Sequence, residues 1–102
     1  MPITAVSELQ ALEGEDPRDG YVRVMRELNG GQPMTKRSEW GEGLLAHTHN
    51  VGEDGSALVV DVWRDQAAMD TFMERLRPVL GEDVADQMTV RVFDTNDLVI
   101  EG

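Results

Sequence analysis

Cysteine is absent from the 102 residues, and aromatic residues are few: two Trp, one Tyr and two Phe. Without cysteine the chain can form no disulfide, thiolate nucleophile or thiolate metal site. Basic residues are also scarce, because nine Lys and Arg stand against twenty Asp and Glu, for a net charge of −11. A charge of that sign repels phosphate backbones and anionic lipid headgroups. We therefore expect no nucleic-acid partner and no membrane partner.

Long apolar runs are missing as well. No stretch approaches the roughly 20 apolar residues of a membrane span, and no basic residue precedes the short apolar run at the start. We expect a cytoplasmic protein with no bound cofactor, since no phosphate-loop or dinucleotide-binding glycine pattern surrounds Gly30-Gly31. The length suits one domain with a single modest core.

The first 20 residues differ from the rest of the chain. They hold five acidic residues and one basic residue, and Gly14, Pro17 and Gly20 interrupt any regular element there. Val6 and Leu9 lie three apart, which favours a short helix from Ala5 to Glu13. We interpret residues 1–20 as an acidic N-terminal arm and residues 21–102 as the folded domain.

Within that domain the hydrophobic period alternates between two and three to four residues, which separates strands from helices. The patterns predict strands at Tyr21 to Leu28, Leu44 to His49, Ala57 to Arg64 and Met88 to Phe93, and helices at Thr35 to Glu42 and Asp65 to Leu80. Asp54-Gly55 predicts a tight turn between the second and third strands. This order indicates an α+β, ferredoxin-like split βαβ domain with a four-stranded antiparallel sheet.

Alternation also predicts which strand residues share a face. The face expected beneath the helices is apolar throughout and comprises Val22, Val24, Leu58, Val60, Val62, Val90 and Val92. The other face is mixed and comprises Tyr21, Arg23, Met25, Val59, Asp61, Trp63, Arg91 and Phe93. Such a face is too apolar for water alone, so we expect it to pair with a second copy in a homodimer.

Several segments resemble a known family. These are Gly43 to His47, Glu53-Asp54-Gly55, Val59 to Arg64, and Phe72-Met73 with Leu76 to Leu80. They resemble small bacterial proteins of the dimeric α/β-barrel superfamily, in the branch called antibiotic-biosynthesis-monooxygenase-like. The resemblance implies a dimeric α/β barrel and, as one activity of that branch, cofactor-independent oxygenation of an aromatic or polycyclic phenol or quinol. In such oxygenases an Asn lies four residues before the Trp, and here that position is Val59.

Candidate site residues follow from this resemblance and from their chemistry. His47 is the candidate catalytic residue, because a neutral imidazole can accept a phenol proton, although a structural hydrogen bond is the commoner use. Trp63 is either a flat wall for an aromatic ligand or a core or interface residue. Arg23, Asp61 and Arg91 either hold a phenolate or neutralise one another between subunits.

His49 lies two residues from His47, so both point to one face and we count His49 among the substrate-binding candidates. The pair has no third ligand nearby, and we predict no metal site. The alternative function is a non-catalytic dimeric module that binds a small metabolite or protein partner. Val59 favours this alternative.

Overall fold

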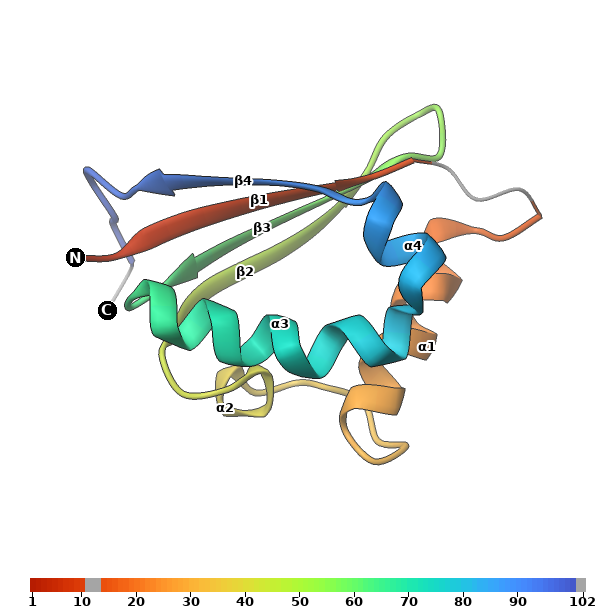
Figure 1. Cartoon of the computed structure of the whole chain (residues 1–102), viewed down its shortest axis with the longest axis horizontal. Coiled ribbons are helices and arrows are strands. Elements are labelled where there is room, and N and C mark those ends of the chain that lie inside the picture. Colours follow the sequence, from red (N-terminus) through yellow and green to blue (C-terminus); the bar gives the residue numbers. More distant parts are fainter. Residues whose placement is uncertain (11–13, 101–102) are drawn as a thin grey trace.

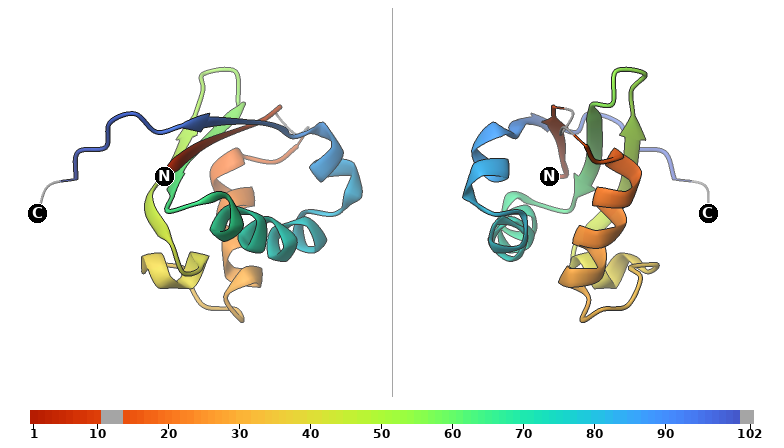
Figure 2. Two further views of the ribbon diagram at one scale, coloured as in Figure 1. Left: turned by 60° about the vertical axis from the view of Figure 1, so that its left-hand side comes forward. Right: turned by 90° about the vertical axis from the view of Figure 1, so that its right-hand side faces the viewer.

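The computed structural model describes residues 1–10 and 14–100 (Figure 1). In chain order the elements are β1 (Ile3–Leu9), α1 (Pro17–Leu28), α2 (Arg37–Trp40), β2 (Leu44–Val51), β3 (Ala57–Trp63), α3 (Gln66–Leu80), α4 (Glu82–Gln87) and β4 (Thr89–Asp94). The four strands form one antiparallel sheet in the order β2-β3-β1-β4. The helices of the described chain lie on one face of this sheet (Figure 2). This arrangement confirms the ferredoxin-like α+β fold.

The first strand is not where the sequence pattern placed it. Residues Ile3–Leu9 form β1, which pairs with β3 on one side and β4 on the other. The helix predicted from Ala5 is therefore wrong as far as Leu9, and its residues 11–13 lie outside the described residues. Burial explains the difference. Ile3 and Ala5 are two residues apart, so in a strand both side chains point to the core, where they are only 7% and 4% exposed. The segment interpreted as an arm thus supplies a central strand of the sheet.

The segment predicted as the first strand is a helix. Tyr21 to Leu28 lie in α1, which starts at Pro17 and is capped by the side chain of Asp16. Proline suits the first helical position, since it has no N–H to leave unpaired there. The alternating valines do not share a buried face: Val24 is buried, whereas Val22 is 49% exposed. The apolar stripe instead follows helical spacing.

The later elements agree with their predicted positions. The boundaries of α2, the β2–β3 hairpin, α3 and β4 all fall within two residues of the expected ranges. Helix α3 continues through Pro78 and ends at Gly81, whose positive φ of 84° suits glycine. The short helix α4 follows at once and was not predicted.

The core lies between the sheet and the helices. Trp63 is its most buried large side chain, 1% exposed, and its ring lies 5.4 Å from the ring of Phe72 on α3. The surrounding buried residues are Ile3, Ala5, Trp40, Leu44, Ala68 and Met69. Trp63 therefore anchors β3 to the helical layer.

The predicted faces of β3 are reversed. Trp63 pairs with Ile3 and Asp61 with Ala5, so these side chains point toward the helices. The alternate residues Leu58, Val60 and Val62 lie on the open face, contrary to the prediction. For β4 the prediction is correct, because Val90 and Val92 share the helix side while Arg91 and Phe93 lie on the open face. The prediction for β3 was wrong because Leu58, Val60 and Val62 are apolar throughout, whereas the alternate face of the strand contains the charged residue Asp61.

Candidate functional site

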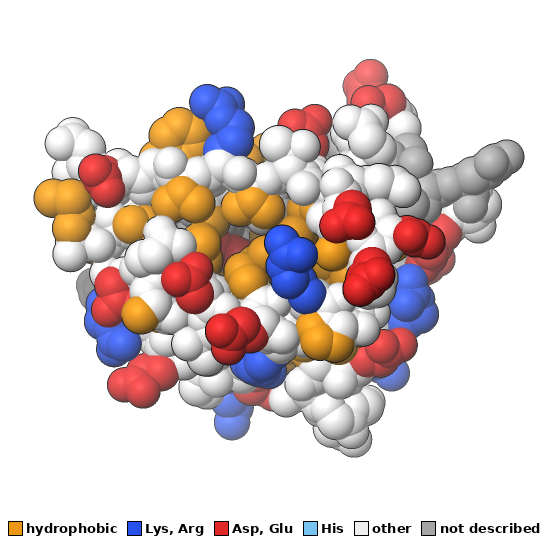
Figure 3. Space-filling model, in the orientation of Figure 1, with side chains coloured by type: hydrophobic (Ala, Val, Ile, Leu, Met, Phe, Trp, Pro, Cys, Tyr) orange, Lys and Arg blue, Asp and Glu red, His pale blue; other side chains and the backbone are white. Residues whose placement is uncertain are grey.

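A cavity of about 140 Å³ lies between the helix-facing side of the sheet and helices α1, α3 and α4. Its walls are mainly apolar and include three methionines, Met25, Met73 and Met88. Hydrophobic side chains gather between the strands and α3 in the space-filling view (Figure 3). Methionine side chains adapt readily to the shape of an apolar ligand.

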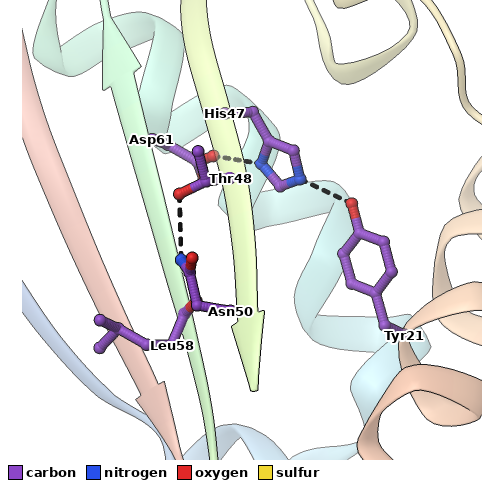
Figure 4. Close-up of polar contacts among 6 residues, drawn as sticks. All are labelled: Tyr21, His47, Thr48, Asn50, Leu58 and Asp61. Carbon is purple, nitrogen blue, oxygen red and sulfur yellow. Dashed lines mark hydrogen bonds and ion pairs between the residues drawn. The ribbon is translucent and has the colours of Figure 1, made fainter. Parts of the chain in front are cut away.

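Three polar side chains from three different elements meet at this cavity. Tyr21 comes from α1, His47 from β2 and Asp61 from β3, and all three line the cavity. The Tyr21 hydroxyl lies 2.6 Å from Nε2 of His47, and Nδ1 of His47 lies 2.5 Å from Oδ1 of Asp61 (Figure 4). His47 and Asp61 are direct partners in the β2–β3 register. The sheet itself therefore positions the imidazole on the carboxylate.

These contacts determine the roles of the two imidazole nitrogens. An ionised carboxylate only accepts hydrogen bonds, so Nδ1 of His47 donates to Asp61. In the neutral ring Nε2 then carries the lone pair, and it accepts the hydrogen bond that the Tyr21 hydroxyl donates. The His47 and Asp61 side chains are only 13% and 10% exposed. A proton arriving at Nε2 would form an imidazolium directly paired with Asp61.

The environment of Tyr21 disfavours its ionised form. Burial, and secondly the negative charge of Asp61, raise the pKa of Tyr21 to about 12. The tyrosine ring stacks on His49, with ring centroids 3.9 Å apart and an angle of 22° between the planes. Burial first, and then the proximity of His47 and Arg18, lower the pKa of His49. Tyr21 therefore stays protonated, and His49 supports it as a neutral aromatic surface.

Trp40 covers another side of His47. This residue ends α2 and is 7% exposed, and its ring centroid lies 4.8 Å from that of His47. Its indole Nε1 has no hydrogen-bond partner among the described residues. Trp40 keeps water from this side of the imidazole.

The structure brings together some of the predicted site residues and separates others. His47, His49, Asp61 and Arg23 line the cavity. Arg23 reaches it from α1, where its Nη2 donates to Oε1 of Glu15 at 3.1 Å near the surface. In the described part of the chain, no group of three or more His, Cys, Asp or Glu side chains could hold a metal ion.

Two predicted residues lie elsewhere. Trp63 is packed in the core and is not among the residues that line the cavity. Arg91 lies on the open face, where its guanidinium carbon is 4.9 Å from the centroid of the Phe93 ring. The prediction that Arg23, Asp61, Trp63 and Arg91 share one face is therefore wrong. Arg23 lies on a helix, and the sheet separates Arg91 from the other two.

Tyr21 and Trp40 were not proposed as site residues from the sequence. Tyr21 begins the helical stripe continued by Val24, Met25 and Leu28, which points toward the core. That spacing, with the Asp16-Pro17 start signal, could have placed Tyr21 over the sheet. Trp40 carries no such signal, because α2 is only four residues long.

Comparisons with known proteins relate the chain to others through its fold. No protein-family model matches the sequence, and no curated protein matches it. Among solved structures, Rv0793 from Mycobacterium tuberculosis superposes with a TM-score of 0.67 at 12% identity, covering 98% of this chain and 100% of that one. The low identity means that this similarity concerns the fold.

Two further similar structures carry functional names. A mutant of SnoaB, a cofactor-independent oxygenase from Streptomyces nogalater, superposes with a TM-score of 0.65 at 15% identity and covers 98% of both chains. An antibiotic biosynthesis monooxygenase superposes with a TM-score of 0.62 at 17% identity, covering 93% of this chain and 99% of that one. The chain therefore shares the fold of these structures, the antibiotic biosynthesis monooxygenase among them, as the resemblance of the sequence predicted. None of its described helices has the length and apolar character needed to cross a membrane.

Proposed function

We propose that this protein binds a small phenol or quinol in the cavity and promotes its oxygenation by dioxygen without a cofactor. The observation that carries the proposal is the hydrogen-bonded series Tyr21–His47–Asp61 at the wall of a mainly apolar cavity. His47 receives the proton of the substrate, and Asp61 stabilises the resulting imidazolium. Arg23 and His49 complete the polar part of the proposed binding site.

The chemistry needs only the substrate and dioxygen. Loss of the hydroxyl proton to His47 leaves a phenolate, whose ring is the reductant. Dioxygen adds to a ring carbon, and protonation gives a hydroperoxide. Loss of the proton on that carbon and cleavage of the O–O bond then release water and leave a quinone. One oxygen atom enters the product and the other leaves as water.

The size of the cavity limits the substrate. A cavity of about 150 Å³ lined by apolar side chains accommodates a single benzene ring, and the cavity here is about 140 Å³. A one-ring phenol or hydroquinone therefore fits without rearrangement, whereas a polycyclic substrate requires displacement of wall residues such as Met25 and Met73. We expect oxygenation to decline from hydroquinone to naphthol to anthrone.

An oxygen electrode tests this function. The purified protein should accelerate dioxygen consumption with hydroquinone-type substrates, and His47→Gln and Asp61→Asn should each reduce the rate by about a hundred-fold or more, the usual contribution of a positioned acid–base group. Thr48→Val is the matched control, because Thr48 follows His47 on β2 but lies on the opposite face, bonded to Asn50 (Figure 4). Oxygen consumption that is equal in all four proteins would contradict the proposal.

A non-catalytic binding module is the second candidate. It is favoured by Val59, which lines the cavity at the position where the oxygenases that the sequence resembles carry an Asn. Such a module would bind a small metabolite in the cavity or a protein partner on the open sheet face. Measurable phenol binding with no dioxygen consumption across the substrate series would support it.

Pairing of two copies through the open sheet face is also proposed. This face carries Thr4, Val6, Leu58, Val60, Val62, Arg91 and Phe93. Leu58 is 37% exposed and Phe93 44% exposed, although both are large and apolar. Sheet-to-sheet packing with a second copy would remove them from water and form the homodimer expected of this fold.

A further inference from the structure

The hydrogen bonding of His47 leaves no free acceptor for a ligand. A neutral imidazole has one lone pair, and in His47 it lies on Nε2 because Nδ1 donates to Asp61. The Tyr21 hydroxyl already donates to that nitrogen at 2.6 Å. A phenol in the cavity can therefore reach His47 directly only if Tyr21 moves away.

Several contacts keep Tyr21 in place. Its ring stacks on His49 at 3.9 Å, its hydroxyl is bonded to His47, and its backbone lies inside the first half of α1. The hydroxyl oxygen nevertheless retains lone pairs that can accept a second hydrogen bond. Since Tyr21 lines the cavity, this oxygen is an acceptor for the hydroxyl group of a bound ligand.

We propose that Tyr21 relays the proton of the substrate to His47. The inference rests on the proposed function, since it requires a phenol in the cavity. The substrate O–H bond breaks as a new O–H bond forms on Tyr21, and the original Tyr21 proton moves to Nε2 of His47. Tyr21 is neutral before and after, the substrate becomes a phenolate that accepts a hydrogen bond from Tyr21, and the imidazolium pairs with Asp61.

The environment of Tyr21 agrees with this relay. Because burial and the charge of Asp61 raise its pKa to about 12, Tyr21 does not act as a separate anionic base. The two proton movements therefore occur together. Without the hydroxyl, the substrate and His47 lose their connection while the apolar cavity remains.

Ionisation of para-nitrophenol tests the relay without any catalytic turnover. This phenol has one ring, which suits the cavity, and only its anion absorbs visible light. Wild-type protein should bind the anion in preference to the neutral phenol, so that the bound ligand ionises at lower pH than the free ligand. In Tyr21→Phe the preference should fall roughly ten-fold, the effect of losing a hydrogen bond to a charged group, while the affinity for the neutral phenol stays within about three-fold.

Matched variants make the result specific. His47→Gln should lose the preference as Tyr21→Phe does, whereas Thr48→Val should behave as wild type. Tyr21 is the only tyrosine in the chain, so global incorporation of fluorotyrosine changes the acidity of this hydroxyl alone and preserves its shape. The relay predicts a shifted ionisation midpoint for the bound ligand in that protein, even if Tyr21→Phe folds poorly.

The possible failures are distinguishable. An unchanged preference in Tyr21→Phe and in the fluorotyrosine protein would overturn the relay, as would tighter anion binding by Tyr21→Phe, which would mean that Tyr21 merely blocks His47. No binding of para-nitrophenol by wild type would overturn both the relay and the proposed function. Normal relay behaviour without dioxygen consumption would overturn the oxygenation alone.

Discussion

At the scale of single residues, the ionisation of Tyr21 provides a direct measurement of its surroundings. Its folded-state pKa is about 12, above the ordinary value near 10. The stability that it contributes is therefore fully present below about pH 10 and is lost as the pH rises toward 12. Tyrosinate absorbance reports this residue alone, so we expect a midpoint near 12 in the native protein and near 10 in concentrated urea.

The control for this titration is Asp61→Asn, which removes the negative charge that contributes, after burial, to the raised pKa of Tyr21. This variant should have a lower native titration midpoint than wild type. Burial of Tyr21 should still keep that midpoint above the value for the unfolded chain. Circular dichroism at each pH verifies that the chain is still folded. A midpoint near 10 in the folded wild-type protein would show that Tyr21 lies open to water and is not part of the cavity wall.

The candidate site was only partly predictable because its members depend on different kinds of information. His47 and Asp61 were both singled out from the sequence, and their pairing follows from the hairpin register. Trp63 was assigned a ligand role or a core role, and its 1% exposure shows that it fills the core. Tyr21 was missed as a site residue because its contact with His47 requires α1 to cross the sheet, which no local pattern specifies.

At the scale of elements, the wrong assignments lie in the first third of the chain, and the short helix α4 was missed. The apolar residues between Tyr21 and Leu28 fit both the two-residue period of a strand and the period of a helix. The Asp16 cap and Pro17 at the first helical position favour the helix. Conversely, β1 is a strand because β3 and β4 supply partners on both sides, and these partners are 48 or more residues away. Tertiary pairing therefore overrides local preference in both segments. The later elements were predictable because turn and cap signals bound them.

One arginine joins three of the helices. Arg75 on α3 donates from Nη1 to the carbonyl of Trp40 at 3.0 Å and from Nη2 to the carbonyls of Glu39 at 3.2 Å and Leu28 at 3.5 Å. These carbonyls lie at the C-terminal ends of α1 and α2, where helical acceptors lack partners. We expect Arg75→Ala to lower the free energy of unfolding by about 1–2 kcal/mol, measured by urea denaturation.

Arg77→Ala is the matched control for Arg75, since Arg77 is an exposed arginine two residues further along α3. Its removal should change stability by less than about 0.5 kcal/mol, as for most surface substitutions. Equal losses in the two variants would indicate that the effect is one of net charge and not of the carbonyl contacts. Because Trp40 covers His47, Arg75→Ala should also weaken phenol binding.

At the scale of the whole molecule, the two faces of the sheet have different proposed roles: ligand binding on the helix side and pairing of two copies on the open side. The residues that line the cavity on the helix side come from one chain, so we expect ligand binding to need no second copy. The open side presents apolar residues, including Leu58 and Phe93, without cover from the helices (Figure 2). Pairing and ligand binding should therefore be separable by mutation.

This separation gives a test of the homodimer. Leu58→Glu combined with Phe93→Glu places like charges on the open face of both copies, and the net charge of −11 adds to their repulsion. We expect sedimentation equilibrium to give the dimer mass for wild type and the monomer mass for the double variant. Val22→Glu is the control, because Val22 is 49% exposed on α1 and away from the sheet, and this variant should remain dimeric.

The monomeric double variant should still bind para-nitrophenol, since its cavity is unchanged. Wild-type protein that sediments as a monomer at high micromolar concentration would contradict the pairing, and loss of ligand binding on dissociation would show that the cavity depends on the second copy.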